Sequence, residues 1–198
     1  IVHHYLEGTT TKIAEDETIE GKVGEQYTTS QAQLEAQYEL VEVPENANGI
    51  MLRKQTIVTY YYRLKKYPYT VNYLEKGTNK VLHTAKIGEE QTWGTVINTA
   101  DEVIEIDGYN YDSADKENLS ISTGENIINI YYTKKNAKVT VHYYEENTTN
   151  KVSEDIEING KVNDDYNTTI ADDIPSKYEL VSEPENKSGK MTEEEIIV

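Results

Sequence analysis

Alternating apolar and polar positions predict strands at both ends of a unit that recurs along this chain. Ile1–Glu7 alternates in this way and is rich in β-branched and aromatic residues, as a strand is. Gln55–Tyr62 has the same character and predicts a closing strand. The elements expected between them are a turn at Gly8–Thr11, a strand over Lys12–Val23, a helix over Thr29–Gln37 and a strand over Tyr38–Val43 that ends at Pro44.

The N-terminal and C-terminal thirds of the chain are copies of one another. Residues 1–29 align with residues 140–168 without gaps, with 15 identities in 29 positions. After an insertion of one residue, residues 38–58 align with residues 178–198 with 11 identities in 21 positions. Self-similarity at this level indicates a repeat architecture.

A diverged middle copy fits between these two. Val71–Glu75 matches Val141–Glu145, and Ile127–Tyr132 matches Ile57–Tyr62. The predicted domains are therefore residues 1–66, 67–135 and 136–198, with the third copy truncated in its last strand. The links between them are short and basic and contain no Gly/Ser tract, so we expect them to be stiff.

The order strand, strand, helix, strand, strand in about 65 residues predicts an α+β fold. We expect tandem small β-grasp, ubiquitin-like modules, each a strand-rich mixed sheet with one short helix across a face. The first and last strands of each module should run parallel at the sheet centre. An all-β sandwich, in which the helix is only a turn, is the alternative.

The amino-acid composition argues against several kinds of partner and binding site. The formal net charge is −17, with 36 acidic and 19 basic residues, which argues against nucleic acid and anionic lipid as partners. No apolar run is long enough to cross a bilayer, so no direct membrane insertion is expected. The absence of Cys removes disulfides and thiolate metal sites. With 17 Tyr and no Phe, we expect thin cores supported by tyrosine. Since Ile1 is not Met and no leader is present, we expect an excised piece of a longer protein.

Several strings resemble a known family. They are Val141–Glu145, Thr148–Lys151, Ile158–Val162, Tyr166, Tyr178–Val181 and Pro184–Asn186, and residues 1–62 carry the same strings plus the closing Val58–Tyr62. They resemble the mucin-binding (MucBP) repeat of Gram-positive surface adhesins. The middle copy departs from the pattern, because it lacks the Pro-Glu-Asn turn and has Trp93 near the place of Tyr27. The resemblance implies a secreted, wall-attached protein, a ubiquitin-like fold and adhesion to mucin or its glycans.

No catalytic motif is present, so no enzyme activity, catalytic residue or cofactor is predicted. His3 and His142 occupy the same repeat position, either as ligand contacts or, as we favour, as residues on a sheet surface. Acidic loops offer calcium candidates or, as we favour, a solvated face. These are Asp107, Asp112, Asp115 and Glu117 in one loop, and Asp164, Asp165, Asp172 and Asp173 in the third copy. No metal site is assigned.

Adjacent tyrosines are the remaining candidates for recognition. Tyr60–Tyr62, Tyr131–Tyr132 and Tyr143–Tyr144 should place rings alternately in the core and on the surface, because side chains alternate along a strand. An exposed Tyr row could stack on sugars, or it could simply cover the sheet face. Trp93, the single Trp, could be a platform for a ligand or, as we favour, fill a core beside the start of the helix. A Lys–Asn cross-link stays open, since no motif singles out a pair.

Together these features predict a non-catalytic, monomeric, elongated fragment of an extracellular, cell-wall-attached adhesin. It would bind host mucin or other glycoproteins weakly and multivalently. The alternatives are a stalk that projects another binding domain, and a protein-binding module that acts by sheet-edge addition. The sequence does not assign the ligand-binding residues.

Overall fold

The computed structural model describes residues 1–198, which are almost entirely strands and loops. The chain forms two compact units, and the boundary between them runs through the middle copy. Unit 1 comprises Ile1–Thr70, Ile87–Asn98 and Asn118–Ile127, and unit 2 comprises Val71–Lys86, Thr99–Glu117 and Ile128–Val198. The division into three modules therefore stays a prediction.

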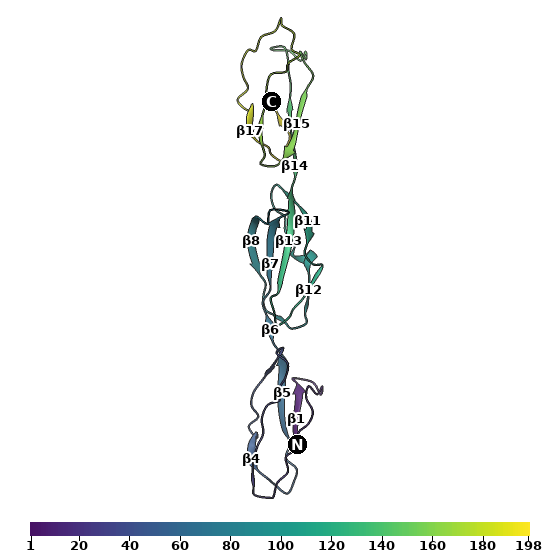
Figure 1. The fold of residues 1–198 in the computed structure, drawn as a ribbon, viewed down its shortest axis with the longest axis vertical. Helices are drawn as coiled ribbons and strands as arrows, with labels where there is room; N and C mark the ends of the chain where they lie inside the picture. The colour runs from purple at the N-terminus through teal and green to yellow at the C-terminus, as the bar shows by residue number, and fades with distance from the viewer. The chain divides into compact units, whose positions relative to one another are not determined.

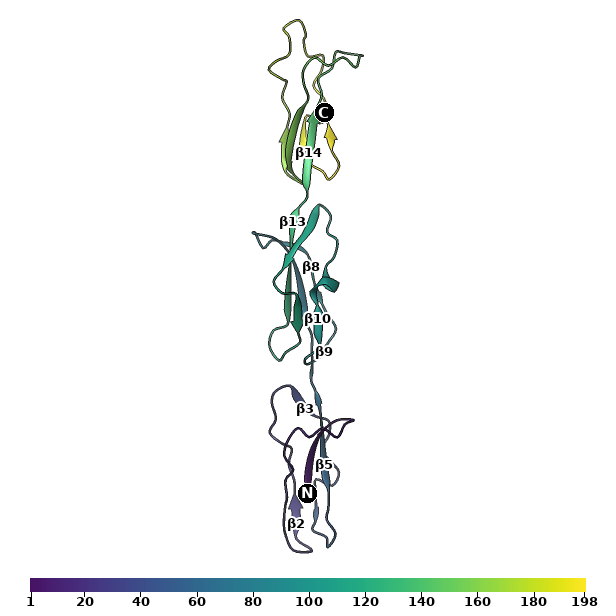
Figure 2. The same ribbon diagram turned by 90° about the vertical axis from the view of Figure 1, so that its right-hand side faces the viewer.

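Unit 1 contains one three-stranded sheet of order β1-β5-β3 and three two-stranded pairs, β2-β4, β6-β9 and β10-β12 (the strands are labelled in Figure 1 and Figure 2). The strands are β1 (Val2–Leu6), β2 (Gln26–Thr28), β3 (Tyr38–Leu40), β4 (Asn48–Ile50), β5 (Val58–Leu64), β6 (Lys66–Tyr67), β9 (Gln91–Thr92), β10 (Val96–Asn98) and β12 (Asn118–Ser120). As expected from the sequence, the first and last strands of the first repeat run parallel, from Val2↔Val58 to Leu6↔Tyr62.

Unit 2 contains the sheets β11-β13-β7-β8 and β15-β14-β18 and the pair β16-β17. Its elements are β7 (Thr70–Glu75), β8 (Val81–Ile87), η1 (Thr99–Glu102), β11 (Tyr109–Ala114), β13 (Ile127–Lys134), β14 (Asn136–Val141), β15 (Ile156–Lys161), β16 (Asp165–Asn167), β17 (Ser188–Lys190) and β18 (Ile196–Ile197). Figure 2 shows β14 in the C-terminal sheet, where it pairs with β18 in parallel and with β15 in antiparallel fashion.

The predicted helix over Thr29–Gln37 is wrong, because residues 29–35 have no regular secondary structure and residues 36–37 form a turn. Its apolar residues Ala32 and Leu34 are two positions apart, and both pack against the core of the first repeat. The Ala32 N–H donates to the hydroxyl of Tyr62 at 2.8 Å instead of to a helical carbonyl. The single helical segment, η1, is a four-residue 3₁₀ turn in the middle copy. The fold is therefore strand-rich, without one short helix in each module.

Buried tyrosines support both cores, as the composition predicts. Tyr60 and Tyr62 are fully buried in the first repeat, whereas Tyr61 between them is 44% exposed. Tyr132, which aligns with Tyr62, is buried in unit 2, and its hydroxyl donates to the carbonyl of Ile104 at 2.9 Å. Burial raises the pKa of both Tyr62 and Tyr132. Each hydroxyl thus forms a hydrogen bond with a backbone segment whose N–H and C=O groups are not paired within a helix.

The link residues Lys65 and Lys135 make the same backbone hydrogen bonds. The N–H of Lys65 donates to Gln37 at 2.8 Å, and its carbonyl accepts from the N–H of Trp93 at 2.9 Å. The N–H of Lys135 donates to Gly108 at 2.9 Å, and its carbonyl accepts from Val162 at 3.1 Å. Each link residue therefore makes backbone hydrogen bonds to segments that lie before it and after it in the sequence.

Candidate functional site

The same four side chains form a surface cluster in the first and third repeats. We call it the His–Asp cluster: His3, Tyr5, Lys12 and Asp16 in one copy, and His142, Tyr144, Lys151 and Asp155 in the other. His and Tyr come from the first strand of each repeat, and Lys and Asp come from the loop that follows. Isolated bridges, Tyr5↔Lys12 and Tyr144↔Lys151, bring loop and strand together.

Each carboxylate of the cluster is held between two basic groups. Nδ1 of His3 lies 2.9 Å from Oδ1 of Asp16, and Nζ of Lys12 lies 2.6 Å from Oδ2. The corresponding distances around Asp155 are again 2.9 Å to His142 and 2.6 Å to Lys151. The first strand and its loop are therefore connected by an identical side-chain arrangement in two copies.

The charges shift the titration of the cluster. The ammonium of Lys12 and then His3 lower the pKa of Asp16, and His142 and then Lys151 lower the pKa of Asp155. Hydrogen bonding to these carboxylates raises the pKa of Lys12 and of Lys151. The carboxylates consequently stay ionised at neutral pH, and each cluster keeps its geometry there.

An aromatic ring borders each cluster. The ring centroids of His3 and Tyr5 are 5.5 Å apart, and those of His142 and Tyr144 are 5.6 Å apart. Tyr144 is 47% exposed, and Tyr5 is half-buried beside its register partner Tyr61. A flat ring next to fixed charged groups can pack on the apolar face of a sugar while neighbouring polar groups meet its hydroxyls.

The middle copy lacks this cluster. Asn72 stands at the His position and donates to Asn129 at 2.9 Å, and Leu74 stands at the Tyr position. The sequence singled out His3 and His142 but missed Asp16 and Asp155. Their identity in the repeat alignment was the available signal.

The acidic calcium candidates are spread over separate ion pairs. Asp112 pairs with Lys76, Asp164 with Lys134 at 3.1 Å, and Asp165 with Lys190 at 2.7 Å. Asp115 accepts from Asn129, and Asp173 accepts from Ser153. Nowhere in residues 1–198 do three or more His, Asp or Glu side chains gather in a way that could hold a metal ion. Trp93, expected in a core, is 37% exposed because its segment pairs with the link at Lys65.

Two duplicated modules, each built on parallel terminal strands, define this chain as a tandem-repeat protein. Comparison with known families identifies which repeat it is. Residues 1–63 and 138–198 match the family model of the MucBP domain, so the chain belongs to the MucBP family. This confirms the resemblance inferred from the sequence.

Two curated relatives match nearly the whole chain. Internalin J of Listeria monocytogenes serovar 1/2a is 32% identical over 198 residues, and Internalin J of serotype 4b is 31% identical over 196 residues. Each alignment covers 96% of this chain and 22% or 20% of the relative. The chain thus spans about a fifth of the length of these relatives.

Among solved structures, the chain is similar to Streptococcal High Identity Repeats in Tandem (SHIRT) domains 3-4 from a cell surface protein. The TM-score is 0.32 and the identity 10%, over 68% of this chain and 95% of the other. A score this low carries no conclusion about the fold. No helix of the structure is both long and apolar enough to pass through a membrane.

Proposed function

We propose that this chain is an adhesive repeat fragment, displayed on the outside of a Gram-positive cell, that binds host mucin-type glycoproteins weakly and at more than one point. The observation that carries the proposal is the duplicated His–Asp cluster with its bordering tyrosine. Membership of the MucBP family supports the same class of ligand. The chain offers no catalytic arrangement that would favour an enzyme.

Tyr5 and Tyr144 are the proposed contacts for sugar rings, with Lys12 and Lys151 as hydrogen-bond donors at the edge of each ring. Two weak sites on one chain raise the apparent affinity for a glycan-dense surface, because the second contact forms at high effective concentration. Since the formal charge is −17, neutral sugars are favoured over sialylated or sulfated ones.

Replacing both Tyr5 and Tyr144 by Leu, the residue that the middle copy has at this position, should abolish binding to immobilised desialylated mucin. Either single replacement should weaken apparent binding by about 10-fold to 100-fold, since avidity is lost. Biolayer interferometry at several ligand densities and a glycan array provide the measurement.

Tyr111→Leu is the matched control, because Tyr111 is 50% exposed and lies outside both clusters. Unchanged binding by the double variant, or equal loss in the control, would exclude the His–Asp cluster as the sugar site. No binding by the unaltered fragment at any density would leave the spacer function below.

A second function, spacing another domain away from the cell wall, is favoured by the backbone hydrogen bonds at Lys65 and Lys135. The backbone N–H of each link residue donates to a segment that precedes it in the sequence, and its carbonyl accepts from a segment that follows it. A link residue held in this way resists bending. Lys135→Pro removes the N–H that donates to Gly108. We expect increased independent motion on either side of residue 135, measured by ¹⁵N relaxation and residual dipolar couplings.

Lys135→Ala is the control variant. A proline at Lys138 cannot be used for this purpose, because Lys138 lies within β14. Lys135→Ala keeps the backbone donor and loses the ion pair with Glu193 at 2.7 Å. If Lys135→Ala loosens the link as much as Lys135→Pro does, the side chain and not the backbone stiffens it.

A further inference from the structure

A pocket of about 620 Å³ opens beside strand β11, and all of the residues that line it belong to unit 2. They are residues 103–107 in the loop before β11, residues 109–111 in β11 itself, Tyr132, Lys135 and Glu193. Figure 1 shows β11 next to β13, the strand that carries Tyr132. The pocket thus combines aliphatic, aromatic and charged side chains.

Hydrogen bonds fix the pocket at both of its ends. The hydroxyl of Tyr132 donates to the carbonyl of Ile104 at 2.9 Å and accepts from the N–H of the same residue at 3.2 Å. Glu193 accepts from the N–H of Gly108 at 2.7 Å and pairs with Lys135 at 2.7 Å. A ligand therefore meets preformed walls, which lowers the entropic cost of binding it.

Tyr111 gives the pocket an accessible aromatic ring. It is 50% exposed and packs on the fully buried Tyr132, with ring centroids 6.3 Å apart and an interplanar angle of 82°. This contact orients the Tyr111 ring while half of its surface stays open to solvent. Aromatic rings attract cations, and the planar guanidinium group of arginine also stacks on them.

The charged side chains of the pocket are mainly acidic. Glu105 and Asp107 form no ion pair within residues 1–198, and Glu193 is matched by Lys135 alone. The lining thus carries a formal charge of −2. Lys135 and then the N–H of Gly108 lower the pKa of Glu193, so this carboxylate is ionised at neutral pH. A cationic ligand is therefore favoured over a neutral or anionic one.

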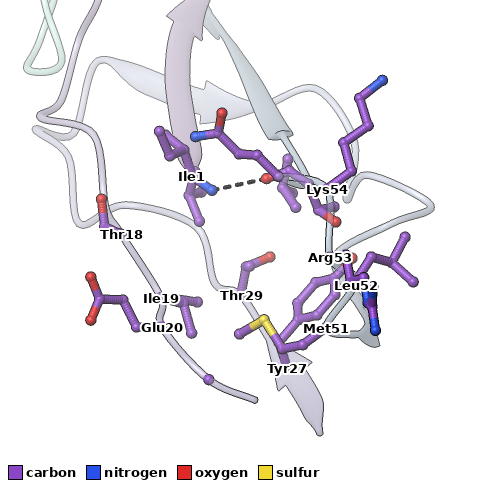
Figure 3. A pocket seen from close by; sticks show the side chains of 15 residues that line it. Ile1, Thr18, Ile19, Glu20, Tyr27, Thr29, Met51, Leu52, Arg53 and Lys54 are labelled. Carbon is purple, nitrogen blue, oxygen red and sulfur yellow. Dashed lines mark hydrogen bonds between the residues drawn. The ribbon is translucent and has the colours of Figure 1, made fainter. Parts of the chain in front are cut away.

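The groove beside Ile1 in the first repeat has the opposite charge balance (Figure 3). Glu20 is the only acidic side chain among those that line it, against the two basic side chains of Arg53 and Lys54. Arg53 also occupies the position of Glu193 in the repeat alignment. The acidic lining is therefore a property of the pocket beside β11 and not of the repeat in general.

The aromatic ring is equally specific to the middle copy. Leu40 pairs with Tyr62 in the register in which Tyr111 pairs with Tyr132. Leu40 is partly buried and packs against the core of the first repeat, whereas Tyr111 is half exposed. The same position in the fold therefore carries a packing residue in one copy and an accessible ring in the other.

We propose that this pocket binds the arginine side chain of a basic peptide segment of a partner protein. The guanidinium group stacks on the ring of Tyr111 and donates hydrogen bonds to Asp107 and Glu105, and its aliphatic stem packs on Val103 and Ile106. The formal charge of −17 on the chain attracts neighbouring basic residues of the same segment. The inference is independent of glycan binding.

The test titrates the peptide acetyl-Gly-Arg-Arg-Gly-amide into the ¹⁵N-labelled full chain. The control ligand has citrulline in place of both arginines, which keeps the shape of the side chain and removes its charge. We expect saturable shifts of the amide signals of residues 103–111 and 193 with the arginine peptide and none with the citrulline peptide. The corresponding lysine peptide should bind about 2-fold to 5-fold more weakly, because it loses the stacking of a planar group.

Variants of the chain separate the pocket from the overall charge. Tyr111→Leu, which introduces the residue of the first repeat, and Asp107→Asn should each weaken binding by about 5-fold to 30-fold. Tyr111→Phe keeps the ring and should bind within about 2-fold of the unaltered chain. Asp172→Asn is the matched control, because it removes the same charge from an exposed residue that does not line the pocket.

Three results would overturn the proposal. They are no binding of the arginine peptide, equal binding of the citrulline peptide, and equal losses in Asp107→Asn and Asp172→Asn, which would indicate attraction to the net charge alone. Binding of mucin by Tyr111→Leu is expected to stay unchanged, so the arginine site and the sugar site can fail separately.

Discussion

Tyr62→Ala is expected to unfold the first repeat at room temperature. The Tyr62 ring is 2% exposed, and its removal leaves a cavity in a core built from few residues. Truncating a buried aromatic side chain costs about 3–5 kcal/mol, which is comparable to the whole stability of a module of this size. Hydrogen exchange of residues 1–64 against residues 136–198 in the same molecule measures the effect repeat by repeat.

Two milder substitutions separate packing from hydrogen bonding. Tyr62→Phe keeps the ring but leaves the Ala32 N–H without its acceptor, at a cost of about 1–3 kcal/mol. Tyr61→Ala should cost about 0.5 kcal/mol, because Tyr61 is 44% exposed on the same strand. If Tyr61→Ala destabilised the repeat as much as Tyr62→Ala, tyrosine burial would not be what stabilises this core.

The first repeat should lose stability as the pH falls from about 6.5 towards 5, and the third repeat should not lose stability in this range. His4 is fully buried between Tyr60 and Tyr62, with ring centroids 5.5 and 5.9 Å away. The Tyr62 hydroxyl accepts from the Ala32 N–H at 2.8 Å and lies 3.1 Å from Nδ1 of His4, so it is placed to donate to the neutral imidazole. Burial lowers the His4 pKa below its ordinary value of 6.5, against the opposing effect of Glu17, whose carboxylate is 4.0 Å from Nε2.

The sign follows from proton counting. Between pH 6.5 and the lower pKa of the folded repeat, the unfolded chain binds the proton and the folded repeat does not. Stability is therefore complete above pH 6.5 and falls with decreasing pH, by at most about 1.4 kcal/mol per pH unit for one proton. The pKa values of Asp16 and Asp155 are lowered in the folded repeats. Protonation of these carboxylates therefore removes a stabilising interaction from both repeats alike, but in a more acidic range.

His4→Tyr is the decisive variant, because both other copies have tyrosine here, at Tyr73 and Tyr143. It should abolish the pH dependence of the first repeat between pH 7 and 5, as measured by urea unfolding or hydrogen exchange at each pH. A variant that unfolds with the same pH dependence as the unaltered protein would show that another group titrates.

The strands with strict alternation were predictable from sequence, and so was the repeat itself. Tyr60, Tyr61 and Tyr62 alternate between core and surface as their positions require. The helix was mispredicted because Ala32 and Leu34 carry a period of two, and that period outweighed the helix propensity of the segment once Tyr62 satisfied its backbone. The hydrogen bond between Ala32 and Tyr62 joins residues far apart in the sequence, so no local sequence pattern predicts it.

The candidate site was predictable only in part. The matching positions of His3 and His142 indicated a shared role on the surface, and the structure adds the carboxylates that fix them. Lys12–Val23 was predicted as a strand, yet in the first repeat it pairs only at Lys12 and Glu17, whereas residues 156–161 of the third repeat form β15. The aligned residues 156–161 pair along their whole length with β14, and this tertiary partner is what the local sequence pattern does not contain.

The parallel pairing of β1 with β5 has a mechanical consequence. A pull on Ile1 and an opposite pull on Leu64 act along the two strands, since parallel neighbours enter at one end of the pair and leave at the other. Such a load shears all the rungs from Val2↔Val58 to Leu6↔Tyr62 at once and does not peel them apart one after another. Flow over a surface to which the chain is tethered would therefore strain the repeat in its most resistant direction.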